Sequence, residues 1–162
     1  MALDHQPLRF LLLTCAFATT ASTTADGGPI TNPQSGKCID ADTDMYPKDG
    51  TKLQLYKCNG ESEQTWLVRA GRIESAKSGK CIDADSGTYP KDGTKLQLYK
   101  CNGGDSQQWT VTGGRIKNTK SGKCIDADTD TYPKDGTKLQ LFSCKGTKSQ
   151  SWSAPPAPTP PR

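Results

Sequence analysis

Histidine is almost absent from this 162-residue chain, since the only one is His5, near the amino terminus. The remainder therefore lacks the side chain most often used for general acid–base catalysis. Apolar residues make up only 32% of the composition, and no apolar run is long enough to span a bilayer. The 21 basic and 17 acidic residues are interspersed. These absences predict no nucleic-acid partner and no membrane insertion, and they disfavour an enzyme.

The first 25 residues have the layout of a secretory signal peptide. Arg9 precedes an apolar stretch and then small residues, with possible cleavage after Ala18, Ala21 or Ala25. Cleavage also removes Cys15 and leaves six cysteines, an even number that favours disulfides in an oxidising compartment. We therefore expect residues 1–25 to be a signal peptide and the mature chain to be secreted and extracellular.

The rest of the chain consists of one unit written three times, with the segment Ser-Gly-Lys-Cys-Ile-Asp-Ala-Asp recurring unchanged at Cys38, Cys81 and Cys124. The period is 43 residues and no insertion breaks it. A unit this short cannot bury its own apolar residues and must pack against its copies. An open solenoid has atypical end repeats. Three near-identical copies therefore favour a closed threefold arrangement.

Within each copy, turn residues separate short segments of alternating polarity, which predicts strands. In the first copy the expected strands are 37–40 and 52–57, followed by a hairpin that turns at Ala70-Gly71. The third copy stops after Trp152, whereas the first begins with the unpaired Ile30. Pairing of these two ends would complete a third hairpin and bring the termini together. The sequence thus predicts an all-β fold, a β-trefoil of twelve strands.

Three motifs recur in phase: Cys-Ile-Asp, Gln-Leu-Tyr-Lys-Cys or Gln-Leu-Phe-Ser-Cys, and Gln-x-Trp. Together they resemble the ricin B-chain type lectin domain, a family of carbohydrate-binding modules. The resemblance covers Ile30 to about Ser153. It implies a β-trefoil with one shallow sugar pocket and one disulfide in each copy, a glycan or polysaccharide as partner, and no cofactor. The expected organisation is a lectin domain over residues 26–153 and a Pro-rich tail or linker over 154–162.

Two disulfide schemes respect the threefold pattern. One joins cysteines within each copy, and the other joins each copy to the next. The resemblance favours the first. Its bridges are Cys38–Cys58, Cys81–Cys101 and Cys124–Cys144.

The bridge within a copy leads to a further expectation about strand register. If Cys38 lies opposite Cys58 in an antiparallel pair, Asp40 lies opposite Tyr56. The same register places Asp83 opposite Tyr99 and Asp126 opposite Phe142. A sugar needs such a pair, because its C–H face stacks on an aromatic ring while its hydroxyls donate to a carboxylate.

The candidate sugar-binding residues come from equivalent positions in the three copies. They are Asp40, Gln54, Tyr56, Asn59 and Gln64; Asp83, Gln97, Tyr99, Asn102 and Gln107; and Asp126, Gln140, Phe142 and Gln150. The resemblance also calls for Asn before each Gln-x-Trp, where this chain has Glu63, Ser106 and Ser149. The third copy further lacks Asn after its second cysteine and the tyrosine hydroxyl. We therefore expect the first two pockets to bind sugar better than the third.

Other repeated residues have simpler interpretations. Trp66, Trp109 and Trp152 fall on alternating strands and are expected in the core. Tyr46, Tyr89 and Tyr132 precede proline in a loop and are expected to be packing residues. The run Asp40-Ala-Asp42-Thr-Asp44 resembles the start of a calcium loop, but it lacks the required Gly and Glu, so no metal site is expected.

Repeated carboxylates in equivalent surroundings do not provide the asymmetric acid and base of an enzyme. The chain is therefore interpreted as a non-catalytic lectin. A first alternative is an accessory targeting module of a secreted glycoside hydrolase, with a catalytic domain beyond the Pro-rich tail. A second is a trefoil inhibitor or ligand of a protein partner, a class that lacks the motifs in phase.

Overall fold

The computed structural model describes residues 27–157. The predicted signal peptide and the last residues of the tail, 158–162, lie outside this range. Within it the fold is all-β, and none of its short helices is long and apolar enough to cross a membrane. The strands and 3-10 helices are β1 (Thr31–Asn32), β2 (Lys37–Ala41), β3 (Thr51–Lys57), η1 (Ser62–Gln64), β4 (Trp66–Arg69), β5 (Arg72–Ser75), β6 (Cys81–Ala84), β7 (Thr94–Tyr99), η2 (Asp105–Gln107), β8 (Trp109–Thr112), β9 (Arg115–Asn118), β10 (Cys124–Ala127), β11 (Thr137–Phe142) and η3 (Lys148–Gln150).

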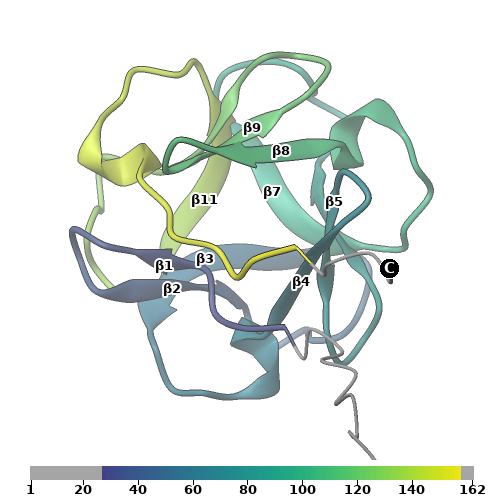
Figure 1. Cartoon of the computed structure of the whole chain (residues 1–162), viewed down its shortest axis with the longest axis horizontal. Coiled ribbons are helices and arrows are strands. Elements are labelled where there is room, and N and C mark those ends of the chain that lie inside the picture. Colours follow the sequence, from purple (N-terminus) through teal and green to yellow (C-terminus); the bar gives the residue numbers. More distant parts are fainter. Residues whose placement is uncertain (1–26, 158–162) are drawn as a thin grey trace, which may run out of the picture.

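The three copies close into a ring through one long strand from each. β3 pairs with β7, β7 pairs with β11, and β11 pairs with β3. Figure 1 shows these strands around the centre, with one lobe of loop and 3-10 helix from each copy outside them. β4 pairs with β5 and β8 pairs with β9 as antiparallel hairpins, which are the hairpins of two of the three copies. This confirms the predicted β-trefoil.

The two ends of the chain build the third hairpin together, as predicted. Thr31 and Ser153 exchange backbone hydrogen bonds of 2.8 Å in each direction. The pair stands where Leu67 and Glu74 stand in the hairpin β4–β5. The expected count of twelve strands is wrong by one. The last segment, next to β1 in Figure 1, makes an isolated bridge at Ser153, and eleven strands are found in residues 27–157.

The disulfides lie within the copies, Cys38–Cys58, Cys81–Cys101 and Cys124–Cys144, each with a Cα–Cα distance of 5.1 Å. The predicted pairing is therefore confirmed.

The predicted register, in contrast, is wrong by two residues. Cys38 lies opposite Tyr56, and Asp40 lies opposite Gln54. The reason is that β3 ends at Lys57, so that Cys58 lies beyond the ladder and reaches back to its partner. The same shift places Asp83 opposite Gln97 and Asp126 opposite Gln140. Tyr99 and Phe142 accordingly pair with Cys81 and Cys124.

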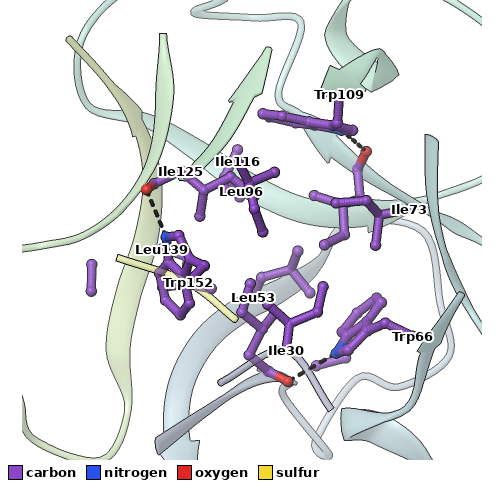
Figure 2. Packing of buried hydrophobic residues seen from close by; sticks show 14 of the residues in the cluster. Ile30, Leu53, Trp66, Ile73, Leu96, Trp109, Ile116, Ile125, Leu139 and Trp152 are labelled. Carbon is purple, nitrogen blue, oxygen red and sulfur yellow. Dashed lines mark hydrogen bonds between the residues drawn. The ribbon is translucent and has the colours of Figure 1, made fainter. Parts of the chain in front are cut away.

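The tryptophans lie in the core, as expected. Trp66, Trp109 and Trp152 are at most 3% exposed. Each indole N–H donates to the carbonyl of the isoleucine in the Cys-Ile-Asp strand, at 2.9–3.0 Å, which ties the hairpin layer to the barrel. Figure 2 shows these bonds around a cluster of isoleucine and leucine side chains from all three copies.

A buried polar group on the last residue of the hairpin distinguishes one copy from the other two. Asn118 donates to the carbonyls of Asp105 and Gln108 at 2.8 and 3.0 Å, and its Oδ1 accepts from Tyr89. Asn32 makes the same set of contacts in another copy. In the remaining copy the position holds Ser75, which is 2% exposed and bonds Tyr46 but is too short to reach the carbonyls. Tyr46, Tyr89 and Tyr132 are partly buried against the core, which confirms that they are packing residues.

We expect Ser75→Asn to stabilise the protein by about 1 kcal/mol, because it supplies two buried donors to η1. Asn118→Ser is the matched control and should destabilise by about 1–2 kcal/mol. Urea unfolding followed by circular dichroism measures both. A loss of stability in Ser75→Asn would show that this copy is packed too closely to accept the amide.

Each copy also contacts the next copy through the aspartate of its Pro-Lys-Asp-Gly loop. Asp49 accepts hydrogen bonds from the ammonium of Lys80 and from the backbone N–H of Lys100. The Lys80 ammonium holds the pKa of Asp49 below its ordinary value. The other two contacts are Asp92 with Lys123 and Ser143, and Asp135 with Lys37 and Lys57.

Candidate functional site

The candidate site of the second copy lies where β6, β7 and η2 meet. Asp83 points outward from the middle of β6 because its neighbours on that strand, Ile82 and Ala84, face the core. Tyr99 ends β7 on the same side as Gln97. The strand alternation therefore brings a carboxylate, an amide and a ring to one surface.

These side chains line a hollow of about 410 Å³, a volume in the range of small-molecule pockets. Five of its seven lining residues are polar but uncharged or aromatic, and two are carboxylates. They are Asp83, Asp85, Ser86, Gln97, Tyr99, Asn102 and Ser106.

Asp83 forms the polar base of this second pocket. Its side chain is 4% exposed and accepts hydrogen bonds from Gln97 Nε2 at 3.0 Å and from Ser106 Oγ at 2.9 Å, one on each oxygen. A carboxylate has about four acceptor positions, so two stay available for hydroxyl groups of a ligand. Tyr99 is 39% exposed, which is unusual for an aromatic residue, and offers its ring beside the carboxylate.

The equivalent residues of the first copy have a similar frame, with an additional carboxylate beside it. Asp40 accepts from Gln54 at 2.9 Å and from Gln64 at 3.0 Å. Glu63 occupies the place at which Ser106 donates in the second copy. Burial raises the pKa of Asp40 above its ordinary value, and the nearby charge of Glu63 raises it further. Tyr56 is 40% exposed.

The hollow of the third copy, at about 80 Å³, is smaller than that of the second. Asp126 accepts from Gln140 at 2.9 Å and from Ser149 at 2.8 Å. The ring of Phe142 has the ammonium of Lys145 above it, 4.9 Å from the centroid. An ammonium group thus covers the ring of Phe142, whereas the rings of Tyr56 and Tyr99 in the other two copies are exposed.

The glutamines of the Gln-x-Trp motifs are buried beside the candidate sites, and Gln150 also lines the third hollow. Gln64, Gln107 and Gln150 are at most 2% exposed, and each Oε1 accepts the backbone N–H of the residue after the second cysteine. Each Nε2 donates to the carbonyl of the residue before that cysteine. They brace the loop that carries Asn59 and Asn102, both of which are exposed.

Several pocket residues were not predicted from the sequence. Ser106 and Ser149 depart from the family motif, yet their hydroxyls donate to the central carboxylates. Asp85, Ser86 and Lys145 line the second or third pocket. The sequence marks Ser106, Ser149 and Lys145 as departures from the pattern, but it does not indicate that the two serine hydroxyls donate to the carboxylates.

Two other hollows lie on the hairpin side, away from the carboxylates. One, of about 370 Å³, lies between the turn at Ala70-Gly71 and Gly103. The other, of about 460 Å³, lies between the hairpins and the start of the Pro-rich tail, where Ala154 packs on the core. Neither is lined by an acidic residue or by an exposed aromatic ring.

The frame found three times here, a buried carboxylate beside an aromatic ring above a Gln-x-Trp brace, agrees with a comparison against known families. The family model of the ricin-type beta-trefoil lectin domain matches residues 26–152. The chain belongs to this family. Carbohydrate binding is the activity that the ricin-type lectin fold supports. No curated protein sequence matches the chain.

Solved structures with the same ricin-type fold come from several kinds of protein. ThreeFoil, a designed threefold-symmetric protein, is 26% identical with a TM-score of 0.72, and the match covers 81% of this chain and 99% of ThreeFoil. The exo-beta-1,3-galactanase 1,3Gal43A from Clostridium thermocellum is 28% identical with a TM-score of 0.68, and the match covers 79% of this chain but 29% of that enzyme. The ricin B-like lectin of Macrolepiota procera, solved with lactose, is 22% identical with a TM-score of 0.63, over 78% and 92% of the two chains, and shares the fold.

Proposed function

We propose that this ricin-type domain is a secreted, non-catalytic lectin that binds a glycan or polysaccharide mainly through its second pocket. The observation that carries the proposal is the buried Asp83, with free acceptor positions, beside the exposed ring of Tyr99. The leader-like residues 1–25 and three disulfides support secretion, because disulfides persist in oxidising compartments. The first pocket is the second binding site, and the third differs from both.

The test is a glycan array followed by titration calorimetry on the best ligand. Tyr99→Ala removes the stacking surface without disturbing the core and should weaken binding about tenfold. Asp83→Ala should weaken it about tenfold or more, because a charge-assisted hydrogen-bond acceptor is lost. Met45→Ala is the matched control, since Met45 is similarly exposed but does not line the second pocket.

Equal binding by wild type and by a protein with both Tyr56→Ala and Tyr99→Ala, with the melting temperature unchanged, would overturn the proposal. So would the absence of any saccharide ligand on the array. The double variant is useful because neither ring is buried, so its failure to fold is not expected.

A second candidate is an accessory module that targets a glycoside hydrolase to its substrate. Its support is the Pro-rich segment from Ala154, which has the composition of a semi-rigid spacer, and the likeness to less than a third of a galactanase. Both candidates use the same pockets. They differ only in whether a catalytic domain is joined to this domain.

A further inference from the structure

The loop between the second cysteine and the Gln-x-Trp motif carries a different charge in each copy. The first copy has Asn-Gly-Glu-Ser-Glu with two carboxylates, and the second has Asn-Gly-Gly-Asp-Ser with one. The third has Lys-Gly-Thr-Lys-Ser with two ammonium groups. The predicted site residues before this loop are the same in all three copies, except that Phe142 replaces a tyrosine, so most of the divergence between the pockets lies in this loop.

Lys145 occupies the position of Asn59 and Asn102 and lies within its pocket. Its ammonium is 4.9 Å from the centroid of Phe142, and both residues line the third hollow with Asp126. Its backbone N–H donates to Gln150 Oε1 at 2.7 Å, which fixes the start of the side chain. Among residues 27–157, no ion pair involves Lys145.

Other charges beside this loop have the same sign. Lys148, three residues on, forms no ion pair within the described range either. The guanidinium of Arg115 packs against Gly146. The residue equivalent to Arg115 in the first copy is Arg72, which forms an ion pair with Glu74. The position equivalent to Glu74 beside Arg115 holds Lys117, so Arg115 has no such carboxylate partner there. The third pocket therefore has a surplus of positive charge at its rim.

A neutral sugar and an acidic sugar meet this rim differently. To stack on Phe142, a neutral ring must displace the ammonium, which forfeits a cation–π interaction of about 0.5–1 kcal/mol. An acidic group on the sugar instead gives the displaced Lys145 a new charged partner. Asp126 repels an acid, but its counterparts Asp40 and Asp83 do so equally and do not distinguish the copies.

We propose that the third pocket binds saccharides that carry an anionic group, a carboxylate or a sulfate, through Lys145, while the second pocket binds neutral ones. This inference rests on the proposed lectin function. The domain would then bind two classes of sugar at the same time, one in each pocket. An acidic polysaccharide with neutral branches would engage both pockets.

The experiment uses matched ligands and matched variants. Methyl galactoside, its 6-sulfate and methyl galacturonide, with the corresponding glucose series, are titrated into the protein while backbone amide shifts of Asn102 and Lys145 are followed by NMR. At Lys145 the acidic ligands should bind about fivefold tighter than the neutral ones. Lys145→Asn, which copies the first two pockets, should abolish that preference. Asn102→Lys should create it in the second pocket.

Equal affinity of neutral and acidic ligands at Lys145, or an unchanged preference in Lys145→Asn, would overturn the inference. Binding of inorganic sulfate at Lys145 as tightly as the sugar sulfate would overturn it too, since the saccharide would then contribute nothing. In these cases neutral ligands still bind at Asn102 and the lectin function stands. Failure of every ligand in both series at both residues counts against the lectin function itself.

Discussion

Trp66→Ala is expected to lower the free energy of unfolding by about 3–5 kcal/mol. Trp66 is fully buried and contributes both volume to the shared core and a hydrogen bond to the carbonyl of Ile39. Alanine leaves a large cavity and an unpaired buried acceptor. Urea unfolding monitored by far-ultraviolet circular dichroism measures the loss, and the remaining stability of so small a domain makes partial unfolding at room temperature an expected result.

Two further variants separate the contributions. Trp66→Phe keeps most of the packing but leaves the Ile39 carbonyl unpaired, and should cost about 1–3 kcal/mol. Trp152→Ala tests ring closure, because Trp152 lies next to Ser153 at the junction of the two chain ends. It should cost as much as Trp66→Ala. A loss below about 1 kcal/mol for Trp152→Ala would mean that the junction is open in solution.

Removal of one disulfide by the double substitution Cys81→Ala and Cys101→Ala should destabilise the protein by about 3 kcal/mol. The bridge spans a sequence separation of 20 residues, so its loss frees a substantial loop in the unfolded chain. Differential scanning calorimetry of the purified double variant gives the change. Sugar binding at the second pocket should weaken as well, because the bridge anchors the strand end that carries Tyr99 and the loop that carries Asn102.

The matched control is the equivalent double substitution in the third copy, Cys124→Ala with Cys144→Ala. That bridge closes a loop of the same length, so its removal should destabilise by the same amount while leaving binding at the second pocket unchanged. If the second-copy variant kept wild-type affinity for a neutral sugar, the bridge would contribute to stability alone.

The overall fold was predictable because the same pattern of strands and turns occurs in all three repeats. The strict 43-residue period, the apolar alternation at Leu53 and Leu55, and the missing hairpin partner of Ile30 together required closure, and the mutual pairing of β3, β7 and β11 confirms it. The burial of the tryptophans followed from the same alternation. Local pattern and global symmetry pointed to one architecture.

The register was not predictable in the same way. A disulfide restrains two Cα atoms to within about 7 Å, which allows either a directly opposed pair or one shifted along the strand. The predicted strand 52–57 already ends at Lys57 and leaves Cys58 outside it. The error lay in treating a bridge between a strand residue and a loop residue as a directly opposed pair. As a result, the cysteine pairing suggests Tyr56 as the partner of Asp40, whereas the ladder places Asp40 opposite Gln54.

The glutamines of the Gln-x-Trp motif show another limit. Pattern reasoning groups Gln64 with the sugar-binding residues because it recurs beside them. The structure shows that its side chain is buried and holds both the Asp40 carboxylate and the backbone of Asn59. Gln64 is the buried residue of η1, at 2% exposed, and this burial could not be read from its recurrence in the sequence.

The aspartate contacts between copies give the repeat a direction. Asp49 of one copy accepts hydrogen bonds from Lys80 and Lys100 of the next. Equivalent contacts are made at the other two junctions. Such a head-to-tail contact is the heterologous type, which generates a ring when its rotation closes. The three repeats are thus arranged as the subunits of a cyclic trimer would be, and because peptide bonds join them the ring does not depend on protein concentration.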